Sequence, residues 1–415
     1  MSAAPLMSER RVSLIAAILV ALGPVSMSLY TPAMPQLVAA FDTTPAVIKA
    51  TMTFYFAGFA VSQLVAGPVA DAFGRRAAAL SFIALYILGS LLATIAPTVE
   101  ALIAARLIQG IGSAVGQTVA RAIVRDLYSG ETGARIMNTV AIMLAAAPAF
   151  SPAIGGVTMA LAGWHMIFVL MVVAGVIVGA IVAFMLKETG QRDRSHVKPA
   201  RIVRNYWSLA RNAEFLSSGL TAAFGVGVLY ALATLLPFVL IDEVGMHPTT
   251  FGFAMMAQSL AFLFGSLVFR VFARWTSPRT LVLPGLAFFL VGGALMAVLP
   301  HLAGASPLTV MGPVAVYAFG VAFVMPFMMM AGLIPFPHIA GSASAMAGFM
   351  QMGGGLLGGS VAAAVGAPLL AFSTVIPAMG VLSILSYCWY LSATRRTRRR
   401  HVDEVVTHAT VAPAE

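Results

Sequence analysis

The sequence predicts an all-α membrane protein with twelve transmembrane helices in two pseudo-symmetric six-helix bundles. Of its 415 residues, 60% are hydrophobic and only 9% are charged, with a mean hydropathy of +0.95, whereas a soluble domain carries about 25% charged residues. Apolar runs of about 20 residues, the length that crosses a bilayer as a helix, recur along the chain. The longest polar segment, 187–211, separates six of these runs from the other six.

The apolar runs follow one another with short polar connections. The first begins after Arg10-Arg11 with no clear cleavage site, so we expect it to be retained as a span. In chain order, the expected spans are 12–33, 46–70, 77–96, 100–125, 134–158, 164–186, 213–240, 249–272, 280–299, 308–332, 341–368 and 373–393. They predict an N-terminal six-helix bundle over 1–186, a cytoplasmic linker over 187–212, a C-terminal six-helix bundle over 213–394, and a basic, disordered cytoplasmic tail over 395–415.

The basic residues predict the orientation of the chain. Lys and Arg gather in the loops on one side of the expected membrane, whereas the opposite loops carry acids and a single Lys or Arg, Lys49. Because cytoplasmic loops are enriched in Lys and Arg, we expect both termini to be cytoplasmic. An even number of spans requires the same.

Composition and charge exclude several functions. The formal net charge of +10 does not indicate nucleic-acid binding, because the arginines lie between apolar runs and not on a soluble basic face. The single cysteine, Cys388, excludes an intramolecular disulfide. The seven histidines show no metal-binding spacing, so no metal or cofactor is expected. A membrane enzyme would need clustered nucleophiles or bases, and the sequence offers none.

One fixed charge stands inside the fourth expected span. Arg106 at membrane depth costs from about 3 kcal/mol upward, so it needs a wet cavity or a partner. At about 100° per residue, Gly110, Ser113 and Gln117 share its helix face, and Gln109 lies at the margin. We predict that this polar stripe lines a substrate path. The alternative is an arginine held structurally by an ion pair or by carbonyl groups.

Four further polar side chains in expected spans are candidates for the same path: Tyr30, Tyr55, Gln63 and Tyr230. The alternative for each is a bond to a neighbouring helix, a common role for polar side chains in membranes.

The loop Gly67-Pro-Val-Ala-Asp-Ala-Phe-Gly-Arg-Arg76 resembles the signature between spans two and three of the major facilitator superfamily. Gly74 permits a tight turn, and Asp71 can accept hydrogen bonds from a helix N-terminus or pair with a neighbouring arginine. An ordinary turn with positive-inside arginines is the alternative. The resemblance implies a latch that holds the two halves in one conformational state, although Ala72 stands where a basic residue is usual. The predicted latch residues are Gly67, Asp71, Gly74, Arg75, Arg76, Arg125 and Asp126.

Other stretches narrow the resemblance to the Bcr/CflA group of multidrug exporters, which also contains chloramphenicol and florfenicol exporters. They are Tyr-Thr-Pro-Ala-Met-Pro at 30–35, the fourth-span stretches at 106–112 and 121–126, the antiporter-like motif at 147–156, and the segments 163–168 and 340–345. In the antiporter-like motif, Pro148, Pro152 and the pair Gly155-Gly156 would bend and thin the fifth span so that it packs closely and pivots. Simple helix packing is the alternative.

A weak internal repeat supports two related halves. Gly67 and Arg76 have counterparts at Gly265 and Arg274, and the same spacing carries Gly155-Gly156 onto Gly353-Gly354. Two six-span halves with a binding site at their interface are a known plan for transporters.

The resemblance implies a multi-pass exporter of the bacterial inner membrane, a monomer in the lipid bilayer that moves a small-molecule substrate by proton antiport. One departure concerns Ser28, which stands two residues before Tyr30, where this group often has an aspartate. No carboxylate lies near the middle of any expected span, although such a group usually carries protons and binds cations. We therefore expect neutral or anionic substrates. A metabolite importer or uncoupled facilitator on the same fold is the alternative, because a fold alone does not set the function.

Overall fold

The computed structural model describes residues 6–128, 130–190 and 199–410, and this part of the chain is helical, without β-strands. The helices are α1 (Glu9–Tyr30), η1 (Thr31–Ala33), α2 (Met34–Ala40), α3 (Pro45–Phe73), α4 (Arg75–Thr94), α5 (Val99–Ser113), α6 (Val115–Leu127), α7 (Gly130–Met185), α8 (Pro199–Ala210), α9 (Ala213–Pro237), η3 (Phe238–Glu243), α10 (Pro248–Phe272), α11 (Val282–Leu302), α12 (Pro307–Leu333), η4 (Pro337–Ile339), α13 (Ala340–Val365) and α14 (Pro368–Thr410).

Ten stretches of described helix are long and apolar enough to cross a membrane. One of them, α7, has 56 residues and would be about 84 Å long as one straight helix, far more than the roughly 30 Å of a bilayer core. Gly163, at a φ of 74°, divides it into two crossings. The 26-residue α13 packs along α3 and α9 and supplies one more. The prediction of twelve transmembrane helices is confirmed.

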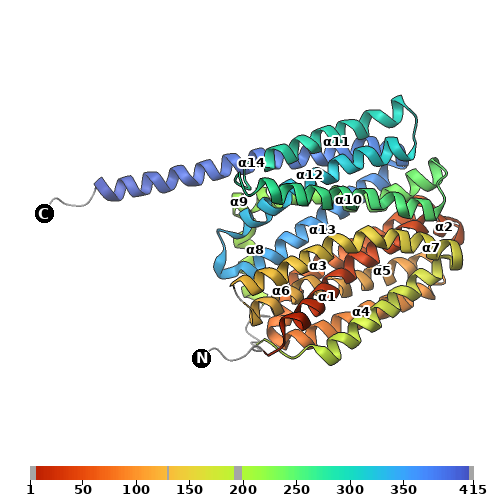
Figure 1. The fold of residues 1–415 in the computed structure, drawn as a ribbon, viewed down its shortest axis with the longest axis horizontal. Coiled ribbons are helices and arrows are strands. Elements are labelled where there is room, and N and C mark those ends of the chain that lie inside the picture. Colours follow the sequence, from red (N-terminus) through yellow and green to blue (C-terminus); the bar gives the residue numbers. More distant parts are fainter. Residues whose placement is uncertain (1–5, 129, 191–198, 411–415) are drawn as a thin grey trace.

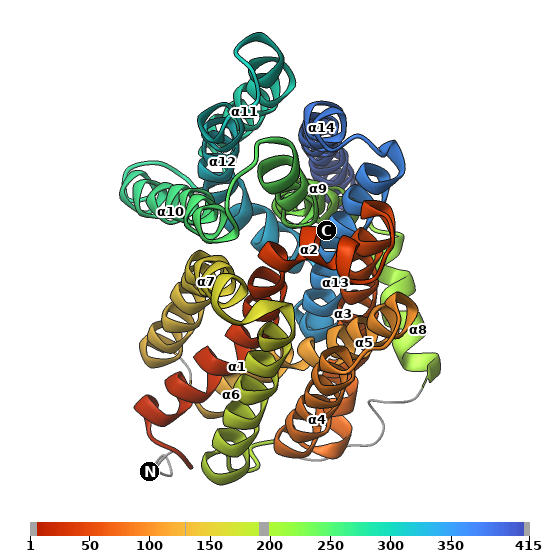
Figure 2. The same cartoon turned by 90° about the vertical axis from the view of Figure 1, so that its right-hand side faces the viewer.

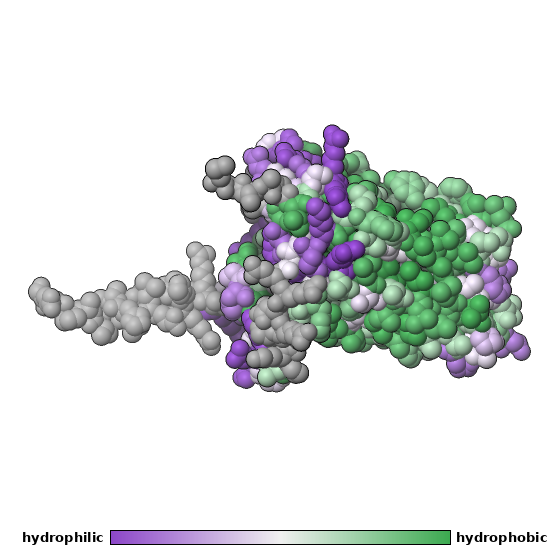
Figure 3. All heavy atoms as spheres, turned by 90° about the horizontal axis from the view of Figure 1, so that it is seen from below, coloured by the Kyte–Doolittle hydropathy of each residue, from purple (hydrophilic) through white to green (hydrophobic). Residues whose placement is uncertain are grey.

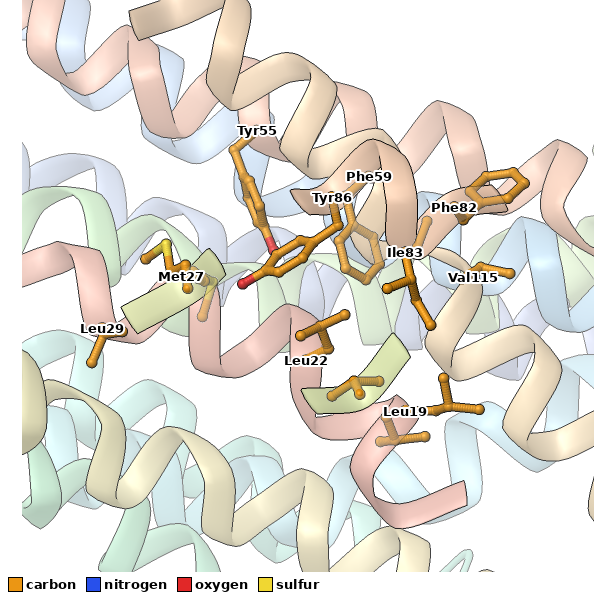
Figure 4. Packing of buried hydrophobic residues seen from close by; sticks show 14 of the residues in the cluster. Leu19, Leu22, Met27, Leu29, Tyr55, Phe59, Phe82, Ile83, Tyr86 and Val115 are labelled. Carbon is orange, nitrogen blue, oxygen red and sulfur yellow. The ribbon is translucent and has the colours of Figure 1, made fainter. Parts of the chain in front are cut away.

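The spans form two bundles, which Figure 2 shows nearly end-on. Helices α1 to α7 enclose one hydrophobic core, and α9 to α14 enclose a second one of similar composition. Figure 4 shows part of the first core, where Leu19 and Leu22 of α1 pack towards Ile83 of α4 and Phe59 of α3. The bundles meet mainly along two helix pairs, α3 with α13 and α7 with α10.

Local sequence signals set where several helices begin. The side chains of Thr44, Thr98, Asn212 and Ser306 each accept a hydrogen bond from a backbone N–H three residues further on. These N-caps satisfy donors that the helix itself leaves unpaired. They fix the start of four spans.

The surface is divided by polarity along the helix axes. Figure 3 shows a broad hydrophobic belt between a large polar group at one end and a smaller one at the other. The larger group marks the end where α1 begins and from which α14 projects (Figure 1). It includes Arg11, Arg75 and Arg125, and we call it the basic end; the opposite end, with Asp42 and Asp242, is the far end. A belt of exposed apolar side chains is the surface that a bilayer requires.

Two segments outside the spans contain helix. The linker 187–212 contains a helix, α8, at the basic end, where Tyr206 donates a hydrogen bond to the carbonyl of Leu64 in α3 at 2.6 Å. The last apolar stretch, Pro368–Arg396, ends close to the expected boundary, and its helix α14 continues beyond it to Thr410. No glycine or proline interrupts that stretch, so nothing in the sequence stops the helix. The residue boundaries of the two bundles remain a prediction.

Candidate functional site

Arg106 lies on α5 and is completely buried inside the first bundle. The helices around it approach closely because glycines face them. A Cβ on Gly110 would lie 2.9 Å from the carbonyl carbon of Tyr55 on α3, and one on Gly89 of α4 would lie 2.5 Å from the backbone nitrogen of Gln109. Small residues of this kind let membrane helices pack at backbone contact. The tight packing brings side chains of α1, α3 and α4 around the guanidinium.

Two aromatic rings enclose the Arg106 charge. Its Cζ lies 4.4 Å from the ring centroid of Tyr30 and 4.3 Å from that of Tyr55. One terminal nitrogen donates to the side-chain oxygen of Gln109, and the other lies 3.2 Å from the sulfur of Met52. No ion pair involves Arg106 in the part of the chain that the structure describes, and its Nε has no hydrogen-bond partner there. Ring faces, each worth about 0.5–2 kcal/mol, partner this charge where no carboxylate does.

The same residues hold one another through hydrogen bonds. The Gln109 amide nitrogen donates to Ser90 at 2.7 Å. The Tyr55 hydroxyl lies within hydrogen-bond distance of two acceptors, the Gly23 carbonyl at 2.9 Å and the Ser113 hydroxyl at 3.1 Å. Figure 4 shows the hydroxyls of Tyr55 and Tyr86 directed towards the same region beside α1. Four of the predicted site residues, Arg106, Gln109, Ser113 and Tyr55, therefore form one buried polar cluster.

The cluster lies in the interior of the first bundle. Tyr30, which bonds Thr51 at 2.8 Å, is also fully buried, and Ser28 on α1 is 5% exposed. The stripe faces the interior of its own bundle, because the rings and amide there can surround the charge without water. A role of Arg106 in transport stays a prediction.

A separate cleft of about 550 Å³ opens at the basic end. It lies between α3 and α6 of the first bundle, the start of α13 in the second bundle, and α8. Its lining consists of Gln63, Gly67, Pro68, Asp71, Arg75, Thr118, Arg121, Ala122, Arg125, Arg201, Ile202, Asn205, Pro337, His338, Ile339, Ala340, Gly341, Ser342, Ser344 and Ala345.

The remaining predicted path residues lie in or near the surface between the bundles. Gln63 lines the cleft beside Gly348 of α13, and its buried amide nitrogen has no partner among the described residues. Gln117 accepts a hydrogen bond from Arg121 at 3.2 Å. The ring of Tyr230 on α9 lies 5.8 Å, centroid to centroid, from that of Phe56 on α3, tilted by 42°. These three are not part of the Arg106 cluster.

The predicted latch residues gather at the basic end. Arg75 pairs with Asp71 and with Asp126, the latter at 3.1 Å. Gly74 has a φ of 100°, which turns α3 sharply into α4. Glu188 accepts from the backbone N–H of Arg75 at 2.6 Å and so caps the start of α4.

The other latch residues complete this group. Arg76 donates to the carbonyl of Ala183 at 2.6 Å, Arg125 lies 3.8 Å from Asp126, and Gly67 lies on α3 opposite Thr118. The ion pairs of Arg75 join helices of the first bundle to one another. Whether these residues also latch the two halves stays a prediction.

The antiporter-like motif lies on α7, at the crossing with α10 towards the far end. A Cβ on Gly156 would lie 3.0 Å from both the carbonyl carbon of Pro248 and the Cα of Thr249. Reciprocally, a Cβ on Gly252 would lie 2.9 Å from the carbonyl carbon of Pro152. Gly155 faces the other way, against Leu29 of α1, and Pro148 lies a further turn back along α7. The neighbouring glycines thus join α7 to a helix of each bundle.

A charged contact lies at the same end. The Lys49 ammonium of α3 stands 4.9 Å above the ring of Phe238, at the start of the π-helix η3 in the second bundle. Asp242 and Glu243 on η3 are close enough to interact with it electrostatically. Lys49 is buried. The molecule therefore has a cleft between the bundles at the basic end and close contact between them at the far end.

Comparison with known proteins identifies the family that this arrangement belongs to. The family model of the Major Facilitator Superfamily matches residues 16–359. The chain belongs to the major facilitator superfamily. It is 27% identical over 394 residues to the "Bicyclomycin resistance protein homolog" of Haemophilus influenzae, which covers 92% of this chain and 96% of that protein. It is 28% identical over 388 residues to "Multidrug resistance protein D" of Escherichia coli, covering 92% and 95%.

A solved structure shares the major facilitator fold. The nucleoside transporter NupG superposes with a TM-score of 0.68 at 15% identity, covering 92% of this chain and 99% of that one. The fold class and the resemblance to the Bcr and multidrug resistance transporters are confirmed. This chain is a multi-pass membrane transporter.

Sequence reasoning missed several residues that the structure places between or beneath the helices. Arg121 stood inside a recognised stretch but was not selected, although it is a second arginine in the same span. Lys49 was used only to predict orientation. Its position on the side where the loops carry acidic residues was the signal that could have identified it. Glu188 and Tyr206 carried no such signal, because their partners lie 113 and 142 residues away in sequence.

Proposed function

We propose that this major facilitator is a secondary active exporter of small, neutral or anionic, drug-like compounds or metabolites. It works by proton antiport and alternating access across the bacterial inner membrane. The observation that carries this proposal is the cleft between the bundles at one end, combined with backbone contact between them at the other. A transporter that rocks two bundles about a central site has this shape in one of its states.

The relatives favour export. If the basic end is cytoplasmic, as its arginines favour, both termini are cytoplasmic and the cleft opens to the inside of the cell, a state that exporters and importers share. The names of the two relatives, a bicyclomycin resistance homologue and a multidrug resistance protein, support the outward direction. The transporter acts as a monomer, with 1–186 and 213–394 as its two moving bundles and 187–212 as the linker.

Coupling requires that proton and substrate bias the same two-state equilibrium differently. The candidate proton carriers are the carboxylates at the surfaces between the bundles, Asp71 in the cleft and Asp242 with Glu243 beside Lys49. Protonation of Asp242 or Glu243 would weaken their attraction to Lys49, which crosses between the bundles and exists only while the far end is closed. The lack of a mid-span carboxylate in the expected spans favours one second candidate, an uncoupled facilitator or importer on the same scaffold.

The test uses purified protein in liposomes with an imposed pH gradient and an internal pH dye. Phenicols, bicyclomycin, sulfonamides, cationic dyes and small amino acids are added separately. Release of protons by neutral or anionic compounds, absent from protein-free liposomes, is the expected result. Compound flux without proton movement would replace antiport by facilitated diffusion, and proton release by cationic dyes alone would refute the substrate class.

A further inference from the structure

The cleft at the basic end carries an excess of positive charge. Four arginines line it, Arg75, Arg121, Arg125 and Arg201, against one carboxylate, Asp71. Arg75 is already paired with two carboxylates, and Arg125 lies beside one of them. Arg121 differs from both, because its contacts are neutral.

Arg121 lies on α6 of the first bundle and reaches across to the second. One terminal nitrogen donates to the Ser344 hydroxyl of α13 at 2.5 Å, and the other to Gln117 at 3.2 Å. Among the described residues its partners are a hydroxyl and an amide, which leave its positive charge uncompensated there. A guanidinium in this setting binds a carboxylate more strongly than a neutral acceptor, because both partners are then charged.

The opposite wall adds further donors. Helix α13 begins at Ala340, and no side chain caps its N-terminus. Its first turn, with Gly341 and Ser342, lines the same cleft. The positive end of a helix favours an anion. The anion would therefore stand between a cation of the first bundle and a helix start of the second.

The rest of the lining is suited to an organic molecule. Pro68, Ala122, Ile202 and Ala345 present apolar surface in a cleft of about 550 Å³, within the roughly 300–1,000 Å³ range of small-molecule sites. An inorganic ion would leave most of this surface uncovered.

We propose that Arg121 is the anchor of a binding site for small organic anions, and that their carboxylate bridges Arg121 and the first turn of α13. That the bound anion is the transported compound rests on the proposed function. The residue that recognises the anion is then Arg121 and not Arg106. A carboxylate between the bundles draws them together at the basic end, which is the movement that loading from the cytoplasm requires.

The test compares an isosteric pair of probes, naphthoate and its carboxamide, by calorimetry with the full-length protein in phosphatidylcholine nanodiscs. We expect naphthoate to bind about tenfold or more tightly than the amide, the size of one hydrogen bond between charged groups. Arg121→Gln should abolish this preference, and Arg121→Lys should restore part of it. The matched control is Arg270→Gln, an exposed arginine at the end of α10 outside the cleft, which should keep the full preference.

Three outcomes would contradict the proposed anion site. They are equal binding of the two probes, binding of neither probe, and a preference for naphthoate that persists in Arg121→Gln. Loss of naphthoate binding when phosphatidylglycerol is added would show that a lipid headgroup occupies the site. If no compound is transported in the liposome assay, the exporter proposal is refuted. The anion site is tested separately, by the preference for naphthoate in nanodiscs.

Discussion

The crossing of α7 and α10 offers a direct way to shift the transporter between its states. In the Gly156→Ala variant, the new methyl group would lie 3.0 Å from the carbonyl carbon of Pro248 and from the Cα of Thr249, and closer still to the Pro248 carbonyl oxygen. These are backbone atoms, which cannot rotate away. The two helices must therefore move apart.

The steric cost of this methyl group falls only on the state in which the far end is closed. Overpacking a tight contact by a methyl group costs about 1–3 kcal/mol. A state that opens at the far end has already separated these helices and does not bear that cost. The ratio of far-end-open to far-end-closed molecules should therefore rise about 5- to 150-fold, at 1.4 kcal/mol for each factor of ten.

Spin labels at Ile95 and Leu302 measure this shift. These side chains are 74% and 80% exposed at the far end, one in each bundle, and Cys388→Ser removes the native thiol. Double electron–electron resonance on Gly156→Ala should show a larger population at long distance. In Gly353→Ala, the added methyl group meets no atom within 4 Å, so this control should match the parent protein. If folded Gly156→Ala gives the same distance distribution as Gly353→Ala, the far-end contact does not set the state.

Three further predictions concern single side chains. Arg106→Met should insert and fold, since a buried charge is removed, but should lose transport in the liposome assay; transport at the parental rate would make the charge dispensable. Lys49→Met should raise the ratio of far-end-open to far-end-closed molecules about two- to thirtyfold, because it removes one cation–π contact of about 0.5–2 kcal/mol. An unchanged Ile95–Leu302 distance distribution would contradict this. Tyr206→Phe should lower the free energy of unfolding by about 0.5–1.5 kcal/mol through its lost bond to Leu64. Because burial raises the pKa of Tyr206 to about 12 from 10.0, this contribution should be constant below pH 10 and disappear between about pH 10 and 12 in parallel unfolding titrations of the parent and the variant.

Hydropathy was sufficient to predict the fold because each span is a long apolar run with polar ends. The linker helix α8 was missed because its polar composition hid an amphipathic helix that α3 and α13 hold in place. The continuation of α14 beyond the last span lies in an equally polar, basic sequence. Both helical segments lie outside the apolar runs, where apolar length carries no information.

Helical periodicity predicted part of the Arg106 cluster but not the direction in which it faces. Spacing fixes the angles between side chains of one helix, so Arg106, Gln109 and Ser113 do lie together. It does not fix how that helix is rotated within a bundle, and the rings that enclose the charge come from other helices. The face also ends where α5 stops at Ser113 and α6 begins at Val115. Gln117, predicted on the same stripe, therefore contacts Arg121 at the cleft instead.

Arg106 and Arg121 of the fourth span differ in what a rocking motion can do to them. A group biases a conformational equilibrium only if its interactions differ between the states. All described contacts of Arg106 lie within the first bundle, so rigid rotation of that bundle leaves them unchanged. The contacts of Arg121, Lys49 and Gly156 cross between the bundles and must break or form. Arg106 can therefore take part in transport only if the first bundle itself rearranges. An anion bound to Arg121, in contrast, would contact both bundles at once.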